Sequence, residues 1–203
     1  MIRELADPAV GADIVLPAPS EHGTISVEEA IARRRSRRRY RPDPLSLAQI
    51  SQLLWSAQGI THPRGLRAAP SAGACYPLEA YLVVEEGVFH YRPRGHSLSK
   101  LSKADVRAGL AAAALDQGFI TEAPVTIILT AVYQRTAQRY GERGERYVHL
   151  DVGCAAENVH LQAEALGLGS VAVGAFYDAE VQRVLAPTEE EVPLYLIPVG
   201  YSR

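Results

Sequence analysis

The feature that most constrains the fold is an uncharged stretch, PVTIILTAV, at residues 124–132. Its β-branched side chains favour a strand, and a strand without charge on either face is typical of the buried centre of a sheet. Helical and strand-like patterns alternate around it without a strict β-α-β period. The sequence therefore predicts an α+β fold with a mixed sheet.

Residues 1–25, which contain three prolines and no helical period, are expected to form an extended arm before a single domain at residues 26–203. Ser26 and Ser46 are candidate N-caps of two helices, of which the first would run into an arginine cluster and end at Pro42. Further helices are predicted at 97–117, 145–166 and 178–185, and further strands at 79–85, 88–92, 170–174 and 192–200.

Composition limits the class of protein. With 47% hydrophobic residues, 22% charged residues and a net charge of −2, the chain is typical of a folded globular protein and has no stretch suited to crossing a membrane. Neither Cys75 nor Cys154 belongs to a CxxC pair, and the first ten residues do not look like a secretory signal. We therefore expect a cytoplasmic protein with reduced thiols, in which Cys154 is a small core residue.

Positive charge is concentrated in one place, since seven arginines lie between Arg33 and Arg41. On a continuous helix Arg34 and Arg38 would be neighbours one turn apart, with the Ser36 hydroxyl between them. Guanidinium groups and a hydroxyl that converge in this way suit a phosphate group. The alternatives are a solvated basic face, a targeting signal or, less favoured, a nucleic-acid contact.

Two other segments place small residues where a ligand could approach the backbone. Residues 70–74 (PSAGA) would form a tight loop before a strand, and residues 171–176 (VAVGAF) end a strand with Gly174 and Ala175. Taken singly, each is also compatible with an ordinary turn. The six histidines are scattered and give no metal-ligand spacing with cysteine or acidic residues.

In this order and at these separations, the segments resemble the FMN-dependent nitroreductase superfamily, and within it the SagB-type branch that includes peptide azoline oxidases. The resemblance rests on EEAIARRRSRRRY, APSAGACYPLEAYLVV, RYGERGERYVHLDVGCAAENVHLQAEALGLGSVAVGAF and PLYLIPVGY, and it covers nearly the whole chain. It implies a mainly antiparallel sheet flanked by helices. It also implies a homodimer built on a long helix, with FMN bound at the subunit interface.

The resemblance also implies roles for individual residues. The FMN phosphate would be held by Arg34, Arg35, Ser36 and Arg38, with Arg203 as a further basic ligand. The flavin ring would lie along a loop from the other subunit, made of Pro70, Ser71, Ala72 and Gly73. The ring edge and N5 would face Gln117, Gly174 and Ala175.

Two departures from the family pattern affect the expected activity. Peptide azoline oxidases carry a Lys-Tyr pair before the long helix, whereas this chain has Arg139 and Tyr140, and arginine cannot act as a base. Many nitroreductases have an asparagine where this chain has Ala74. We therefore expect an FMN oxidoreductase that uses NAD(P)H to reduce a nitroaromatic or quinone, with Tyr140 as the candidate catalytic residue. The alternatives are an azoline oxidase acting on a peptide and a non-catalytic flavin-binding protein; neither membrane nor nucleic acid is expected as a partner.

Overall fold

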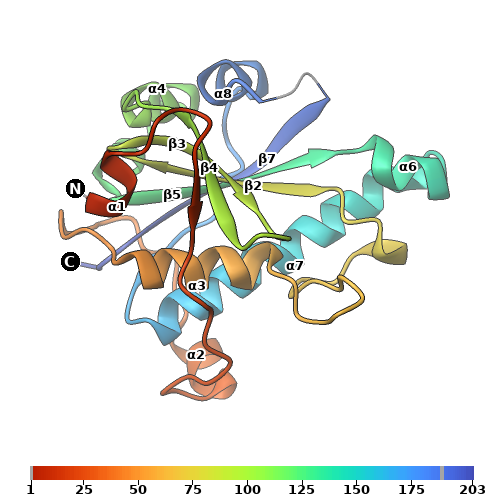
Figure 1. Ribbon diagram of the computed structural model, residues 1–203, viewed down its shortest axis with the longest axis horizontal. Helices are drawn as coiled ribbons and strands as arrows, with labels where there is room; N and C mark the ends of the chain where they lie inside the picture. Colours follow the sequence, from red (N-terminus) through yellow and green to blue (C-terminus); the bar gives the residue numbers. More distant parts are fainter. Residues whose placement is uncertain (1, 188–189) are drawn as a thin grey trace.

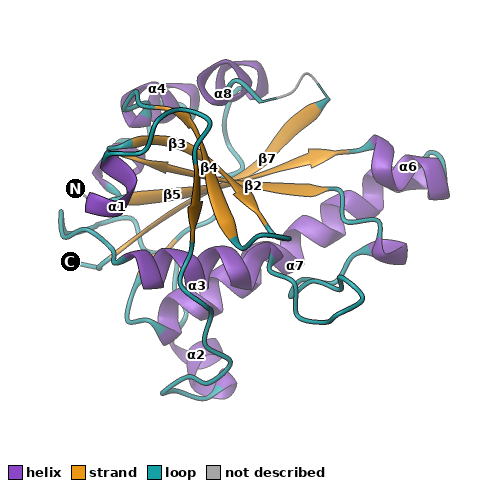
Figure 2. Cartoon of the chain, viewed as in Figure 1, coloured by secondary structure: helices purple, strands orange, loops and turns teal. Residues whose placement is uncertain are grey.

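The computed structural model describes residues 2–187 and 190–203 and is organised around one seven-stranded sheet (Figures 1 and 2). The strand order is β1-β4-β3-β2-β5-β7-β6, and neighbouring strands in this order are antiparallel. The strands are β1 (Asp13–Val15), β2 (Leu78–Val84), β3 (Gly87–Arg92), β4 (Ser97–Ser102), β5 (Val125–Val132), β6 (Gly169–Ser170) and β7 (Glu191–Gly200). The predicted α+β class with a mainly antiparallel sheet is confirmed.

Helices cover both faces of the sheet, with α3 and α7 on one face and α4 and α8 on the other (Figure 1). The helices are α1 (Arg3–Ala6), α2 (Val27–Arg33), α3 (Leu47–Gln58), α4 (Arg107–Ala113), α5 (Phe119–Glu122), α6 (Gln134–Tyr140), α7 (Arg143–Ala165) and α8 (Asp178–Leu185). A short 3-10 turn, η1 (Ala72–Ala74), precedes β2.

The central strand β5 supports two hydrophobic cores, as its uncharged sequence predicts. All eight of its residues are buried. Because side chains alternate along a strand, Ile127 packs into the core under α3 and α7, whereas Ile128 packs into the core under α4 and α8. The sheet is therefore a covered middle layer, and open backbone is left mainly at its edges and in its loops.

Local sequence signals locate several helices closely. The Ser46 hydroxyl accepts a hydrogen bond from the Gln49 N–H at 3.2 Å, and the Gln49 side chain accepts one from the Ser46 N–H at 2.9 Å. This reciprocal capping box fixes the start of α3. The predicted helix at 178–185 is present with those bounds.

Two predicted helices are wrong in their bounds. Residues 97–102 of the predicted 97–117 helix form β4, which pairs with both β3 and β1. The helix that begins after Ser26 ends at Arg33, although it was expected to run through the arginine cluster. In both places tertiary pairing of the backbone overrides local helical preference.

The N-terminal segment, expected to be an extended arm, contains one short helix and one strand. The strand β1 forms an edge of the sheet, with Asp13 opposite Ser99. Residues 1 and 188–189, which fall in the predicted arm and the predicted domain, lie outside the described residues.

Candidate functional site

The arginine cluster is held in a non-helical conformation by the end of the sheet. Ser36 pairs with Ser170 of β6 in a parallel bridge, and the Arg37 N–H donates to the Ser170 carbonyl at 2.9 Å. Four residues later Tyr40 pairs with Ser202. The prediction that Arg34 and Arg38 are neighbours on one helical face is therefore wrong, because the backbone leaves the helix to pair with the C-terminal part of the chain.

The arginines of the segment have different surroundings. Arg35 donates to the carbonyls of Ala32 and Arg34 at 3.1 and 2.7 Å, so it covers the C-terminal end of α2. Arg34 lies 3.8 Å from the Glu157 carboxylate of α7. Arg38 lines a hollow of about 530 Å³ together with Arg203. The side chains of the segment therefore point to more than one surface. The Arg35 guanidinium is already hydrogen-bonded within the chain.

A buried histidine lies behind this segment. His160 of α7 is 7% exposed, and its Nδ1 is 2.7 Å from the Ser170 hydroxyl. Burial, reinforced by the charge of Arg34, lowers the pKa of His160 to about 4. The imidazole is consequently neutral at physiological pH, and it fixes Ser170, which in turn pairs with Ser36.

The turn at Gly174 and Ala175 presents open backbone. The strand predicted at 170–174 is wrong in its bounds, because β6 ends at Ser170 and only an isolated bridge between Val173 and Leu196 follows. Both residues are exposed, and within the described residues neither N–H donates to an acceptor. The Gln117 amide donates to the Ala175 carbonyl at 3.1 Å and to the Ala114 carbonyl at 2.8 Å. Gln117 thus fixes this turn, and the next residue, Gly118, lines the hollow that holds Arg38 and Arg203. Gln117 therefore connects the 174–175 turn with the segment that lines this hollow.

The loop at Pro70, Ser71 and η1 is a strained turn held by side chains. Gly73 and Ala74 have φ values of 58° and 53°. The Ser71 hydroxyl accepts a hydrogen bond from the Tyr76 N–H at 2.9 Å, and the Ala72 N–H donates to both oxygens of Asp151 at 3.2 and 3.3 Å. Asp151 lies on α7 and is 6% exposed. It is a functional-site candidate that the sequence reasoning missed.

Arg139 and Tyr140, at the end of α6, pack against the same loop. The Arg139 guanidinium donates to the Gly73 carbonyl at 3.1 Å. A Cβ added at Gly73 would lie 2.6 Å from the Tyr140 hydroxyl, so glycine is needed for this close approach. The Tyr140 ring also meets the Tyr147 ring edge-on at 4.9 Å. Tyr140 therefore belongs to the loop group.

The sequence-predicted site residues form two groups on different sides of α7. One group joins the arginine segment, Gln117, the 174–175 turn and Arg203; the other joins the loop and Tyr140. Asp151 contacts the loop and His160 contacts Ser170, and nine residues of helix, about two and a half turns, place these two side chains on opposite faces. Figure 1 shows the loop near α6 at one end of the molecule. A single chain does not bring the two groups together.

Comparison with known proteins identifies the family. The family model described as "Nitroreductase family" matches residues 31–201. The chain belongs to the nitroreductase family. A protein of Methanocaldococcus jannaschii named as a nitroreductase, MJ1384, is 47% identical over 194 residues, covering 93% of this chain and 96% of that protein.

Two further relatives support the same assignment of this nitroreductase-family chain. A crystal structure of a Ralstonia eutropha JMP134 protein, also named as a nitroreductase, superposes with a TM-score of 0.85 at 28% identity, covering 97% of this chain and 93% of that one. The trifolitoxin-processing protein TfxB of Rhizobium leguminosarum bv. trifolii is 32% identical over 146 residues, covering 63% of this chain and 39% of TfxB. The expected resemblance to the nitroreductase superfamily is confirmed, and TfxB is consistent with the processing-protein branch.

The outer face of α7 is open in this nitroreductase-family protein. Leu150 is 58% exposed, and Gly153 and Cys154 are exposed beside it. These residues are three and four positions apart and therefore share a helical face. The interpretation of Cys154 as a core residue is wrong, because the phase of the helix turns it outward. None of the described helices is long and apolar enough to cross a membrane.

Proposed function

We propose that the protein is an FMN-dependent oxidoreductase that works as a homodimer. When bound, FMN would take up a hydride from NAD(P)H and pass electrons to a small acceptor of the nitroaromatic or quinone type. The protein's own contribution would be to bind the phosphate, to orient the flavin ring and to exclude water. We also propose that it acts in the cytoplasm, because Cys75 and Cys154 are free thiols and form no disulfide.

The observation that carries the proposal is a set of hydrogen-bond donors that have no acceptor in the described chain. The N–H groups of Gly174 and Ala175 are exposed without an acceptor in the described chain. The exposed side chains of Ser36 and Arg38 likewise make no hydrogen bond or ion pair within the described residues. Cations and a hydroxyl suit a phosphate, and backbone donors suit the ring edge of a flavin. The donor set therefore fits FMN.

In a homodimer, the second subunit would supply the loop that completes the site. In one chain the loop at residues 70–74 lies on the opposite side of α7 from the arginine segment. The exposed face around Leu150 and Gly153 gives a second copy a flat helix to pack against, since a Cβ at Gly153 would meet no atom within 4 Å. We infer that two-fold packing through α7 sets the loop of one subunit over the arginine segment of the other.

Tyr140 would act beside the flavin ring. Its hydroxyl lies against Gly73 in the loop expected to face the ring, so it could hold a proton there. Arg139 donates to the Gly73 carbonyl and keeps its proton, which makes it a positioning residue and not a base. Electron transfer through a flavin needs no protein nucleophile. The protein has to bind and orient the flavin and its substrates.

The first alternative is a SagB-type azoline oxidase that acts on a modified peptide, and the similarity to TfxB favours it. Arg139 argues against an azoline oxidase, because it replaces the lysine of the Lys-Tyr pair found in the peptide azoline oxidases. We expect the native protein to leave a thiazoline peptide unchanged without NAD(P)H. Appearance of the thiazole, followed by mass spectrometry, would support the oxidase instead, and Arg139→Lys is the matched variant that restores the pair.

The test of the proposal is the visible absorbance spectrum of the purified protein, recorded before and after anaerobic addition of NADPH or NADH. A flavin spectrum that bleaches and returns with menadione or a nitroaromatic compound is expected. A bound flavin that neither dinucleotide reduces would favour the non-catalytic alternative. A colourless protein that does not bind added FMN would overturn the proposal.

A further inference from the structure

A cavity beside the loop at residues 70–74 is rich in arginine. Its volume is about 990 Å³, and Ala74 and Tyr76 form part of its wall. The charged side chains that line it are Arg64, Arg67, Arg92, Arg94, Arg135 and Glu79. Five guanidinium groups against one carboxylate are unusual in a protein with a net charge of −2. The charge of the lining therefore favours an anionic ligand.

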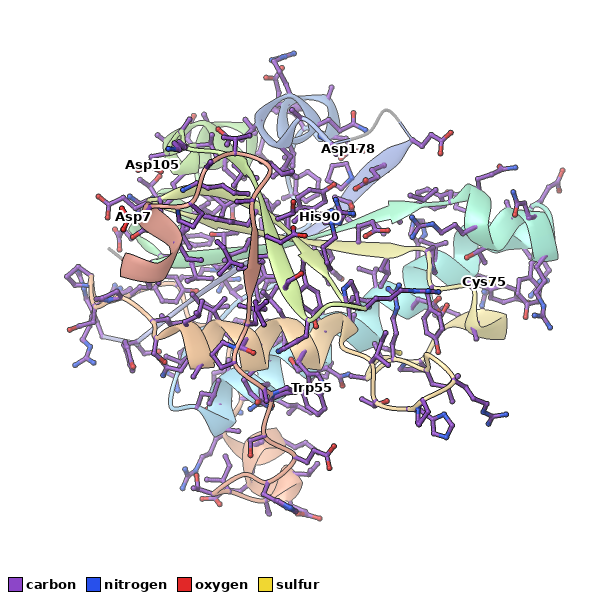
Figure 3. The ribbon with its side chains drawn as sticks, in the orientation of Figure 1. Asp7, Trp55, Cys75, His90, Asp105 and Asp178 are labelled. Atoms are coloured by element: carbon purple, nitrogen blue, oxygen red, sulfur yellow. The ribbon has the colours of Figure 1, made fainter. Side chains whose placement is uncertain are left out.

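The floor of the cavity is a satisfied polar network. Glu79 accepts hydrogen bonds from Arg135 at 2.6 Å and from His90 Nε2 at 2.9 Å (Figure 3 labels His90). Burial raises the pKa of Glu79, but these two hydrogen bonds outweigh it and leave the pKa below its usual value. Glu79 is thus paired with Arg135, and its charge also acts on Arg67. One carboxylate against five guanidinium groups still leaves the lining with an excess of positive charge.

A second arginine is fixed in the wall without a carboxylate partner. Arg67 donates to the Gln58 side-chain oxygen at 2.5 Å and to the Leu78 carbonyl at 3.2 Å. Its guanidinium lies 4.9 Å from the centre of the Tyr76 ring. Both hydrogen-bond partners are neutral. Burial lowers the pKa of Arg67, and the charge of Glu79 partly opposes this shift. A guanidinium nevertheless stays protonated near neutral pH, so Arg67 contributes positive charge to the wall.

The remaining three arginines lie at the rim and have no side-chain partner among the described residues. Arg64 is at the tip of a turn that is closed by the Gly65 N–H and the His62 carbonyl at 2.8 Å. Arg92 ends β3, and Arg94 lies in the turn before β4. All three are exposed, and their guanidinium groups make no hydrogen bond or ion pair to any described residue. Two ordered turns therefore hold open cations at the mouth of the cavity.

We propose that this cavity binds the polyanionic part of a redox substrate, namely an organic molecule with two or more phosphate or carboxylate groups. Its rim arginines would bind these groups, and its apolar wall, which includes Ile60 and Leu66, would contact the organic part. The role as a redox substrate rests on the proposed function, because the cavity adjoins the loop expected to face the flavin. The anion could belong to the electron donor, as in the 2′-phosphate of NADPH, or to the electron acceptor.

The test is calorimetric binding of two anions that cannot be reduced: 2′,5′-ADP, which represents the donor, and benzene-1,3,5-tricarboxylate, which represents a carboxylate-bearing acceptor. The rim variant is Arg64→Ala/Arg92→Ala/Arg94→Ala. The control variant, Arg41→Ala/Lys103→Ala/Arg183→Ala, removes three exposed positive charges that do not line the cavity. Urea unfolding of both variants checks that the fold is kept.

We expect at least one probe to bind, with affinity at least about tenfold weaker in the rim variant and nearly unchanged in the control. The probe that is affected identifies the donor or the acceptor as the source of the anion. Absence of binding by both probes, or an equal loss in the two variants, would overturn the proposal. A colourless protein whose probe binding still depends on the rim would refute the flavin proposal alone. A bleachable flavin without probe binding would refute the anion site alone.

Discussion

The loop at residues 70–74 and the arginine segment at residues 34–38 satisfy their polar groups in opposite ways. In the loop, Asp151 holds the Ala72 N–H and Arg139 holds the Gly73 carbonyl. In the arginine segment the backbone is tied to Ser170, while the Ser36 and Arg38 side chains make no hydrogen bond or ion pair among the described residues. The loop is therefore a preorganised surface, whereas in the segment the backbone is fixed and two side-chain donors are left without an acceptor.

The largest expected effect concerns the support of the arginine segment. The His160 pKa is lowered from 6.5 to about 4 in the folded protein, so the unfolded chain takes up a proton at a higher pH. Stability should therefore be lost as the pH falls from 6.5 toward 4, by up to about 3 kcal/mol. Urea unfolding between pH 4 and 7 measures this. His160→Gln should flatten the profile over that range, and an unchanged slope in this variant would refute the assignment.

The support of the loop should respond to a different change. Asp151→Ala leaves the Ala72 N–H without its acceptor, and we expect a loss of about 2 kcal/mol in the free energy of unfolding, the scale of a hydrogen bond to a charged group. Asp151→Asn keeps one side-chain oxygen and should lose clearly less. If the two variants unfold at the same urea concentration as the native protein, Asp151 does not hold the loop.

Substitution of two arginines in the same segment should show which of them binds the ligand and which only supports the backbone. Arg38→Ala should weaken FMN binding by about 1.5–3 kcal/mol, because a charge-assisted hydrogen bond to the phosphate is lost. Arg35→Ala is the matched control, since Arg35 already donates to the carbonyls of Ala32 and Arg34. Fluorescence titration with FMN measures both affinities. Equal losses in the two variants would mean that Arg38 contributes only general charge.

The smallest expected effect tests how closely the loop is packed. Gly73→Ala places a methyl group 2.6 Å from the Tyr140 hydroxyl at a φ of 58°, whereas Gly65→Ala at a φ of 81° meets no atom within 4 Å. Both variants should lose about 1 kcal/mol through backbone strain, and Gly73→Ala should lose more. Adding Tyr140→Phe to Gly73→Ala should recover part of the difference. Equal unfolding free energies for the two glycine variants would rule out the close packing.

Much of the fold could be predicted from the sequence, because its signals are local. The N-cap at Ser46 and the uncharged run at 124–132 each indicate an element through local sequence alone. Residues 97–102 could not be assigned in this way. Their strand exists because β1 and β3 pair with it from either side, and neither pairing is visible in the local pattern.

The site was predicted as a set of segments, but its geometry was not. The arginine cluster leaves the helix because Ser36 pairs with Ser170, which lies 134 positions away in the sequence. Asp151 and His160 were missed because each is a single polar residue on a helix whose apolar pattern hides it. Both become visible only when their partners, Ala72 and Ser170, are placed beside them.

The central claim is that one chain's loop and another chain's arginine segment form a single FMN site. The most direct measurement is FMN binding to a heterodimer of two defective chains. One chain carries Gly73→Val in the loop, and the other carries Arg34→Ala/Arg38→Ala in the segment. The two chains are co-expressed with different tags, and the heterodimer is purified through both tags. A site shared between subunits predicts one FMN per heterodimer, bound with native affinity, because one of its two sites is free of both defects. A heterodimer without native-affinity FMN, or a protein that remains a monomer, would contradict the account.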